Sequence, residues 1–253
     1  MKVQSIDIRY SLQFLSPFHC GVGEGRGLHD RSVYRDSEGF LAIPGSTIKG
    51  LVRNNCESLA RLYGVSVIGP HLPQGKDERK RYVKSILSKY DIIYALFGSP
   101  WHPGTVFFDD ASLDEEWRMY FTDSKSGEHN LRTQRWQVEE RSRVSINRHT
   151  KTADEGGLFT SEYGKRGLGF RGNIYGSYSY LSDTYNPPLP LLVLTAGLEM
   201  IDSIGAETSV GCGRCQVKIE SLQIDGKSKD VTEVLSQLNE LEYLHLAVEG
   251  WGT

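Results

Sequence analysis

The sequence of 253 residues has no apolar stretch that approaches the roughly 20 residues needed to cross a membrane as a helix. It has only four cysteines, too few and too scattered for a disulfide framework, which favours a reducing compartment. The first residues alternate polar and apolar side chains and lack the uninterrupted apolar core of a signal peptide. We therefore expect a soluble cytoplasmic protein.

The sequence also lacks an excess of charge of either sign, since its formal net charge is −3. The total charge thus argues neither for nor against a nucleic-acid partner, because local clustering matters more than the sum. The glycine-rich stretch GVGEGRG (21–27) follows a predicted strand, but no helix opens directly after it, as a dinucleotide fingerprint requires, and it lacks the Gly-Lys-Ser/Thr of a P-loop. The pair CGRC (212–215) has zinc-ligand spacing without a second pair, so a turn is the favoured interpretation.

Hydrophobic periodicity predicts an α+β fold. The order of elements is strand, helix, strand, insertion, strand, helix, strand, which is close to the βαββαβ ferredoxin-like plan. One apolar segment, PLPLLVLTAGLEMIDSIGA (188–206), fits either a helix or a buried strand. The predicted strands are 3–16, 105–113, 168–182 and 216–224, and the first predicted helix follows Ser46 as its N-cap.

Periodicity nearly disappears between residues 123 and 167, where polar and basic side chains dominate. A long, weakly patterned insertion in a compact domain is usually functional. Its arginines alternate on an extended segment and suit a phosphate backbone, while two apolar side chains suit stacking on bases. A solvated hairpin is the alternative, but the number of arginines favours RNA. The predicted RNA contacts of the insertion are Arg141, Arg143, Ser145, Arg148, Leu158 and Phe159.

A second candidate for phosphate binding is PGSTIKGLVR (44–53). Free backbone N–H groups at a helix start, together with Ser46, Lys49 and Arg53, suit an anion. The alternative is a capped helix with two solvated cations, and the spacing alone favours that alternative.

Motifs spread over residues 3–222 resemble, in order, those of the RAMP proteins of CRISPR systems. Within that family the sequence is most similar to the backbone subunit of type III effector complexes, which is repeated along the guide RNA. The motifs are SIDIRYSLQFLSPFHCGVGEG, HDRSVYRDSEGFLAIPGSTIKGLVR, GTVFFDDASL, RSRVSINRHTKTADEGGLFTSEY, LGFRGNIYG and IGAETSVGCGRCQVKI.

The resemblance implies a single domain with a ferredoxin-like (RRM-like) palm, an inserted β-hairpin thumb and a helical or loop lid. It also implies a glycine-rich loop at 209–214 that contacts RNA through Gly211, Gly213 and Arg214. The implied partners are the guide CRISPR RNA, the complementary target RNA, other RAMP subunits and the large subunit of the complex. The implied ranges are palm 1–64, 91–122 and 168–222, lid 65–90, thumb 123–167 and acidic C-terminal tail 223–253.

In target-cleaving members of the family, an aspartate in the loop before PGS lies beside each kinked target nucleotide, and Asp30 matches that position. The resemblance thus implies metal-dependent transesterification with Asp30 as catalytic residue and metal ligand. The cofactor would be Mg²⁺ or another divalent cation, which phosphate oxygens would also bind. A flipped nucleotide can align its 2′-hydroxyl with the scissile phosphate. Whether Asp30 orients that hydroxyl, acts as base or holds the cation stays open.

Two alternatives accompany this hypothesis. The chain is a purely structural guide-binding subunit if Asp30 is only a solvated loop residue. A guide-processing endoribonuclease shares the fold and the glycine loop, but the arginine-rich insertion and PGSTIKG favour the backbone subunit.

Overall fold

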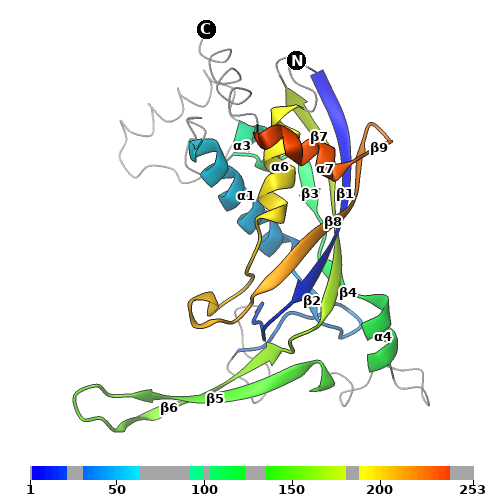
Figure 1. The fold of residues 1–253 in the computed structure, drawn as a ribbon. Helices are drawn as coiled ribbons and strands as arrows, with labels where there is room; N and C mark the ends of the chain where they lie inside the picture. The colour runs from blue at the N-terminus through cyan, green and yellow to red at the C-terminus, as the bar shows by residue number, and fades with distance from the viewer. Residues whose placement is uncertain are drawn as a thin grey trace.

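The computed structural model describes residues 2–21, 31–62, 92–99, 103–122, 135–180 and 188–239. At its centre is β1 (Lys2–Phe14), a strand of 13 residues. It pairs antiparallel with β7 (Gly169–Tyr180) on one side and with β8 (Cys215–Ile224) on the other. These three long strands form the middle of the palm sheet (Figure 1).

The palm sheet is completed by four short strands, in the order β2-β4-β7-β1-β8-β9, with β3 also paired to β7. The single strand predicted over 105–113 is wrong, because the structure divides it at Asp109 and Asp110. The side chain of Asp110 accepts hydrogen bonds from Tyr34 and from the backbone of Gly45, and so ties this break to the neighbouring segments. The short strands are β2 (Ala42–Ile43), β3 (Val106–Phe108), β4 (Ala111–Leu113) and β9 (Lys227–Lys229).

The core lies between one face of this sheet and the four helices of the palm, which Figure 1 shows on the same side of it. Along β1, every second side chain from Ile6 to Phe14 is buried, whereas the side chains between them face away from the helices. Each such burial contributes about 1.5–3 kcal/mol relative to exposure. The alternation that predicted this strand therefore follows from a sheet with one covered face.

The helices of the palm are α1 (Gly45–Leu62), α3 (Ile92–Phe97), α6 (Leu189–Glu199) and α7 (Val231–Ser236). The apolar segment 188–206 thus begins with a helix. All residues of α6 from Leu189 to Leu198 are buried, which explains why no amphipathic period marked it. A Cβ at Gly197 would lie 2.6 Å from Cys56 Sγ, so this glycine allows α6 to pack closely on α1.

A separate two-stranded antiparallel sheet forms a hairpin that projects from one end of the palm (Figure 1). Its strands are β5 (Val138–Ile146) and β6 (Ala153–Gly164), within the range that the resemblance assigns to the thumb. We call this hairpin the thumb. Near its root lies the short helix α4 (Glu115–Phe121).

The α+β class is confirmed. The connection β1-α1-β3-β7-α6-β8, with the antiparallel order β8-β1-β7-β3, is consistent with the ferredoxin-like plan. The predicted lid, 65–90, lies outside the described residues. In the described part of the predicted tail, β9 and α7 are followed by a short 3-10 helix, η2 (Gln237–Asn239).

Candidate nucleic-acid interface

The thumb has two unlike faces because side chains alternate along a strand. Arg141 and Arg143 share one face, and the cross-strand partner of Arg143 is Phe159. Val144 and Leu158 pair on the opposite face, where the Leu158 side chain is 69% exposed. The two predicted stacking residues, Leu158 and Phe159, therefore lie on different faces of the thumb.

Glu207, in the loop before the 3-10 helix η1 (Thr208–Val210), connects the palm to the arginine face of the thumb. Arg143 Nη1 donates to Oε1 at 2.8 Å, and Arg143 Nη2 forms an ion pair with Oε2 at 2.7 Å. The Tyr163 hydroxyl donates to Oε2 at 2.8 Å, and Arg31 Nη1 lies 3.9 Å from Oε1. Three segments that are distant in sequence thus meet at one carboxylate.

The charges in this cluster are fixed at neutral pH. Burial raises the pKa of Glu207, but hydrogen bonds from Tyr163 and Arg143 outweigh it, so the pKa lies below the ordinary value. Burial, followed by the hydrogen bond to Glu207, raises the pKa of Tyr163. The bond to Glu207 also raises the pKa of Arg143. The carboxylate is therefore an anion, and both donors keep their protons.

Arg141 is likewise held by protein groups. Its Nε and Nη2 lie 2.9 Å and 2.6 Å from Glu139 Oε1, and its Nη1 donates to Cys212 Sγ at 3.7 Å. Its guanidinium carbon lies 4.7 Å from the centre of the Tyr163 ring. Arg141 and Arg143, two of the arginines predicted to bind RNA, thus already bind protein groups that hold the thumb against the palm. A phosphate at this face would contact guanidinium groups that also bind Glu139 and Glu207.

A pocket of about 340 Å³ lies where the first turn of α1 meets the segment that follows β1 and the segment just before Glu207. Its lining includes His19, Gly21, Arg31, Thr47 and Gly205. His19 Nδ1 donates to the backbone oxygen of Glu162 at 2.7 Å, because a carbonyl can only accept. In the neutral ring, His19 Nε2 is then an acceptor. A Cβ at Gly21 would lie 2.7 Å from that atom.

The segment after Asp30 is bound to the root of the thumb. Arg31 forms a parallel bridge with Ser161, and its backbone oxygen accepts from Glu162 N at 3.0 Å. The Glu162 carboxylate in turn accepts from the backbone of Val33 at 3.3 Å. Asp30 itself, the predicted catalytic residue and metal ligand, lies outside the described residues.

At the start of α1 the structure corrects the predicted cap. The helix begins at Gly45, so Ser46 lies exposed in the first turn and is not the N-cap. The Gly45 N–H donates to Asp110 Oδ1 at 2.8 Å, so one of the backbone donors predicted to bind an anion already has a carboxylate partner.

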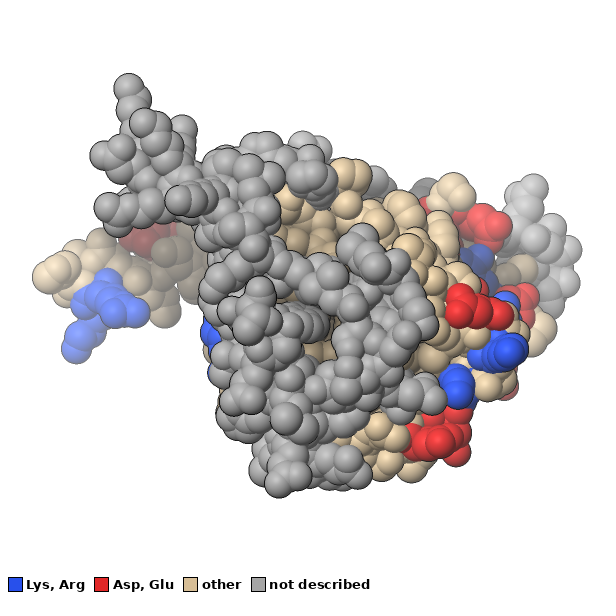
Figure 2. Space-filling model, turned by 90° about the horizontal axis from the view of Figure 1, so that it is seen from above, with Lys and Arg blue, Asp and Glu red and all other residues tan. Residues whose placement is uncertain are grey.

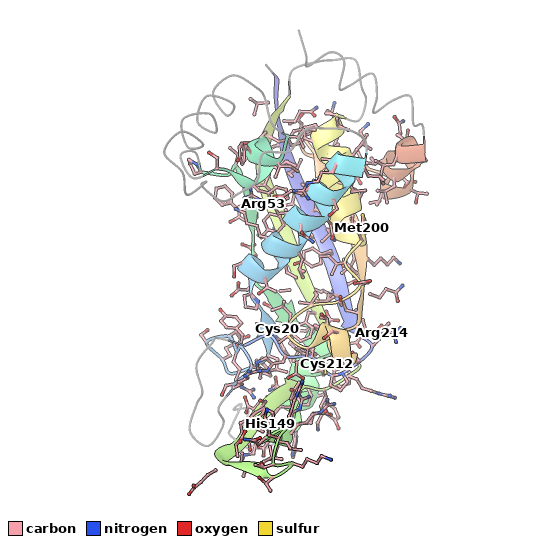
Figure 3. The ribbon with its side chains drawn as sticks, turned by 90° about the vertical axis from the view of Figure 1, so that its left-hand side faces the viewer. Cys20, Arg53, His149, Met200, Cys212 and Arg214 are labelled. Atoms are coloured by element: carbon pink, nitrogen blue, oxygen red, sulfur yellow. The ribbon has the colours of Figure 1, made fainter. Side chains whose placement is uncertain are left out.

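The two predicted cations of α1 are not freely solvated. Burial, followed by the charge of Arg53, lowers the pKa of Lys49. Arg53 Nε donates to Glu57 Oε1 at 2.9 Å, and Glu57 also binds Arg61 at 3.1 Å. Figure 3 shows Arg53 on α1, well separated from Arg214 at the palm end near the thumb. The structure therefore does not bring Arg53 together with the glycine-rich loop.

In the glycine-rich loop, Gly211 and Gly213 have positive φ angles of 88° and 74°. A Cβ at Gly213 would collide with the backbone oxygen of Ile204, whereas a Cβ at Gly211 would meet open space. Gly213 is thus required for packing, and Gly211 leaves the backbone accessible to a ligand. Arg214 is exposed, and its backbone N–H donates to Ser16 Oγ at 2.9 Å.

The tip of the thumb is polar and accessible. Ser145 Oγ donates to Asp154 Oδ2 at 2.8 Å, and Arg148 is exposed in the turn between the strands. Figure 2 shows basic side chains on the hairpin that projects to the left. Of the predicted thumb contacts, Arg148 is the one whose cation stands in open solvent.

No group of three His, Cys, Asp or Glu side chains is placed to hold a metal within the part of the chain that the structure describes. Cys212 and Cys215 are buried free thiols. The described residues therefore do not form a metal site of their own. Among them there is also no helix long and apolar enough to cross a membrane.

Sequence reasoning missed Glu207, Tyr163, Arg31 and His19. The strand period gave a signal for Tyr163, because it continues the face of Phe159 and Ser161. Glu207 lies just before the predicted loop 209–214, and no pattern in the sequence marked it. Its contact with Arg143 spans 64 positions, and no local pattern encodes such a distance.

Comparisons with known proteins agree with this architecture. The model of the RAMP superfamily matches residues 11–216. Two similar solved chains come from cryo-EM structures of type III-B Cmr-beta, one in the apo state and one bound to cognate target RNA. The first has a TM-score of 0.53 at 14% identity and covers 89% of this chain and 98% of its own. The second has a TM-score of 0.55 at 13% identity and covers 90% and 98%. A search of curated proteins found no significant match.

Proposed function

Because the chain belongs to the RAMP superfamily, we propose that it is a guide-RNA-binding subunit of a type III CRISPR ribonucleoprotein complex. The family match over most of the chain supports this proposal, as does the shared fold with Cmr-beta chains. One of those structures contains cognate target RNA, which makes RNA the first ligand to test here. Other RAMP subunits and the large subunit are the protein partners that we propose.

The observation that carries the proposal is the junction of the thumb with Glu207 and with the glycine-rich loop. Glu207 holds the thumb through Arg143 and Tyr163, so the thumb leaves the palm in a set direction. A rigid hairpin with an exposed cation at its tip and exposed apolar side chains on one face suits insertion along an RNA strand. The backbone at Gly211 is open to a phosphate on the palm side.

We further propose that the complex cleaves complementary target RNA by transesterification at a kinked nucleotide and that Asp30 is the catalytic carboxylate. Its chain neighbour Arg31 is bonded to the thumb root and lines the pocket of about 340 Å³. A carboxylate next to this anchored residue can orient a 2′-hydroxyl or accept its proton. A divalent cation such as Mg²⁺, held mainly by RNA phosphates, would stabilise the developing charge.

The test of this chemistry is a target RNA with a single 2′-deoxy nucleotide immediately 5′ of a cleaved phosphate. Transesterification predicts that the assembled complex loses that cut alone, leaves the others unchanged and binds the target as before. Cleavage at the deoxy position would contradict the proposed nucleophile. Cleavage of repeat RNA by the isolated chain would instead support a guide-processing endoribonuclease.

A further inference from the structure

A second pocket, of about 440 Å³, lies at the root of the thumb beside α4. Trp117, Tyr120 and Phe121 of α4 form one side, and Trp136, just before β5, adds a fourth ring. Lys165 and Arg166, directly after β6, complete it. Its volume lies within the range of about 300–1,000 Å³ that is usual for small-ligand sites. The functions proposed above assign no role to this pocket.

Two of its four aromatic side chains, Tyr120 and Trp136, are exposed. Tyr120 is 69% exposed, and its ring centre lies 5.9 Å from that of Trp117 and 5.3 Å from that of Phe121. Phe121 is buried, and Trp117 packs against the core, so α4 is a firm base for the exposed ring. Trp136 is 44% exposed on the thumb side. An exposed ring on a fixed support can stack on a planar ligand without first being ordered.

The charged side chains in the described lining of the pocket have one sign. Lys165 and Arg166 are both exposed, and no carboxylate belongs to the described lining. Neither cation forms an ion pair with any other residue that the structure describes. The backbone N–H of Lys165 donates to Gln137 O at 3.1 Å, which fixes this segment next to Trp136. The pocket therefore combines flat apolar surfaces with two cations that suit an anionic ligand.

We propose that this pocket binds one unpaired nucleotide of single-stranded RNA. The base stacks on Tyr120 and Trp136, and the adjoining phosphate lies against Lys165 and Arg166, a combination that suits nucleic acid better than any apolar partner. The site is continuous with the thumb, because Lys165 follows the last residue of β6. The inference rests on the proposed function in taking RNA as the ligand, but it uses neither Asp30 nor the arginine face of the thumb.

Tryptophan fluorescence of the full chain tests the stacking. Two of the four tryptophans line the pocket, so a short oligouridylate that stacks there should quench the emission. Tyr120→Ala should raise the Kd for this RNA by about 5-fold or more, as expected for the loss of one base–aromatic stack. Unchanged quenching and unchanged Kd in Tyr120→Ala would overturn the stacking arrangement.

The charge contribution has a matched control. Lys165→Ala/Arg166→Ala should reduce the slope of log K against log salt by about 0.7, the value for the loss of one single-strand phosphate contact. Lys227→Ala/Lys229→Ala removes the same charge from β9, at the opposite end of the palm, and should leave the slope unchanged (Figure 1). Equal slopes for the two double variants would overturn the proposed site.

Photocrosslinking in the assembled complex separates this proposal from the proposed function. RNA carrying 4-thiouridine should crosslink to Tyr120 or Trp136, as located by mass spectrometry. If the RNA crosslinks only to the thumb tip and glycine-rich loop, the pocket proposal fails while guide binding stands. If wild type binds no RNA, both proposals fail.

Discussion

The contacts of Glu207 predict that Glu207→Gln, which converts the carboxylate into an amide, loosens the thumb without unfolding the palm. Glu207→Gln keeps the size and backbone of the side chain, including the left-handed φ of 63°. It removes the charge that accepts one hydrogen bond from Arg143 and one from Tyr163 and forms the ion pair with Arg143. The substitution therefore tests the carboxylate and little else.

The magnitude follows from the two hydrogen bonds, the ion pair with Arg143 and the exposure of these side chains. A hydrogen bond to a charged group contributes about 1.5–3 kcal/mol and a neutral one about 0.5–1.5 kcal/mol. The Arg143 and Glu207 side chains are 38% and 17% exposed, so solvent reduces the difference. We expect a loss of about 2 kcal/mol in the free energy that holds the thumb root, or about 30-fold in local opening.

Native-state hydrogen exchange measures this opening directly. In Glu207→Gln, exchange at the backbone amides of Glu162, Gly164 and Lys165 should accelerate about 30-fold. Amides of β1 and β7 should keep their wild-type rates. The matched control is Glu139→Gln, which removes an ion pair to Arg141 within the same strand and should leave the root amides unchanged. Wild-type exchange at those amides in Glu207→Gln would refute the reasoning.

Three further predictions concern the same region. Gly213→Ala should destabilise the protein by about 3 kcal/mol, because strain at positive φ adds to a collision with Ile204 O, whereas Gly211→Ala should cost about 1 kcal/mol from strain alone; thermal unfolding of the two variants compares them. The pKa of Glu207 is lower in the folded state, so the stabilisation it provides is complete above its unfolded pKa of about 4.3 and is lost as pH falls through the folded pKa. Hydrogen exchange at the thumb root should therefore show full protection from neutral pH down to about 4.3, and protection should be lost only below that pH. Arg148→Ala should reduce the salt slope of guide-RNA binding by about 0.7, and an unchanged slope would remove the thumb tip from the RNA path.

The sequence predicted the elements whose side chains alternate between two environments. β1 has one face on the helices and one away from them, so its period was visible. α6 is buried on all sides, and a segment without a polar face cannot reveal its period. The strand predicted over 105–113 divided at Asp109 and Asp110, because Asp110 binds Gly45 and Tyr34, which are distant in sequence.

The candidate site was predictable to a similar extent. The thumb arginines were visible as a basic insertion, and the positive φ of Gly211 and Gly213 agrees with a glycine-rich loop. The partners of those arginines were not visible, since Glu207 and Cys212 approach them only in the folded chain. Asp30 came from the family resemblance, and residue patterns alone did not distinguish it from other loop carboxylates.

Cleavage by the assembled complex tests the central proposal most directly. The assay contains a matching guide, labelled complementary RNA and Mg²⁺, and compares wild type with Asp30→Asn. Asp109→Asn, at an exposed carboxylate of the palm, is the control. We predict that Asp30→Asn binds the target like wild type but loses one or more cuts, whereas Asp109→Asn keeps them all. If Asp30→Asn cuts as wild type does, or if wild type binds the target without cutting it, this chain is a guide-binding scaffold and the nuclease lies elsewhere.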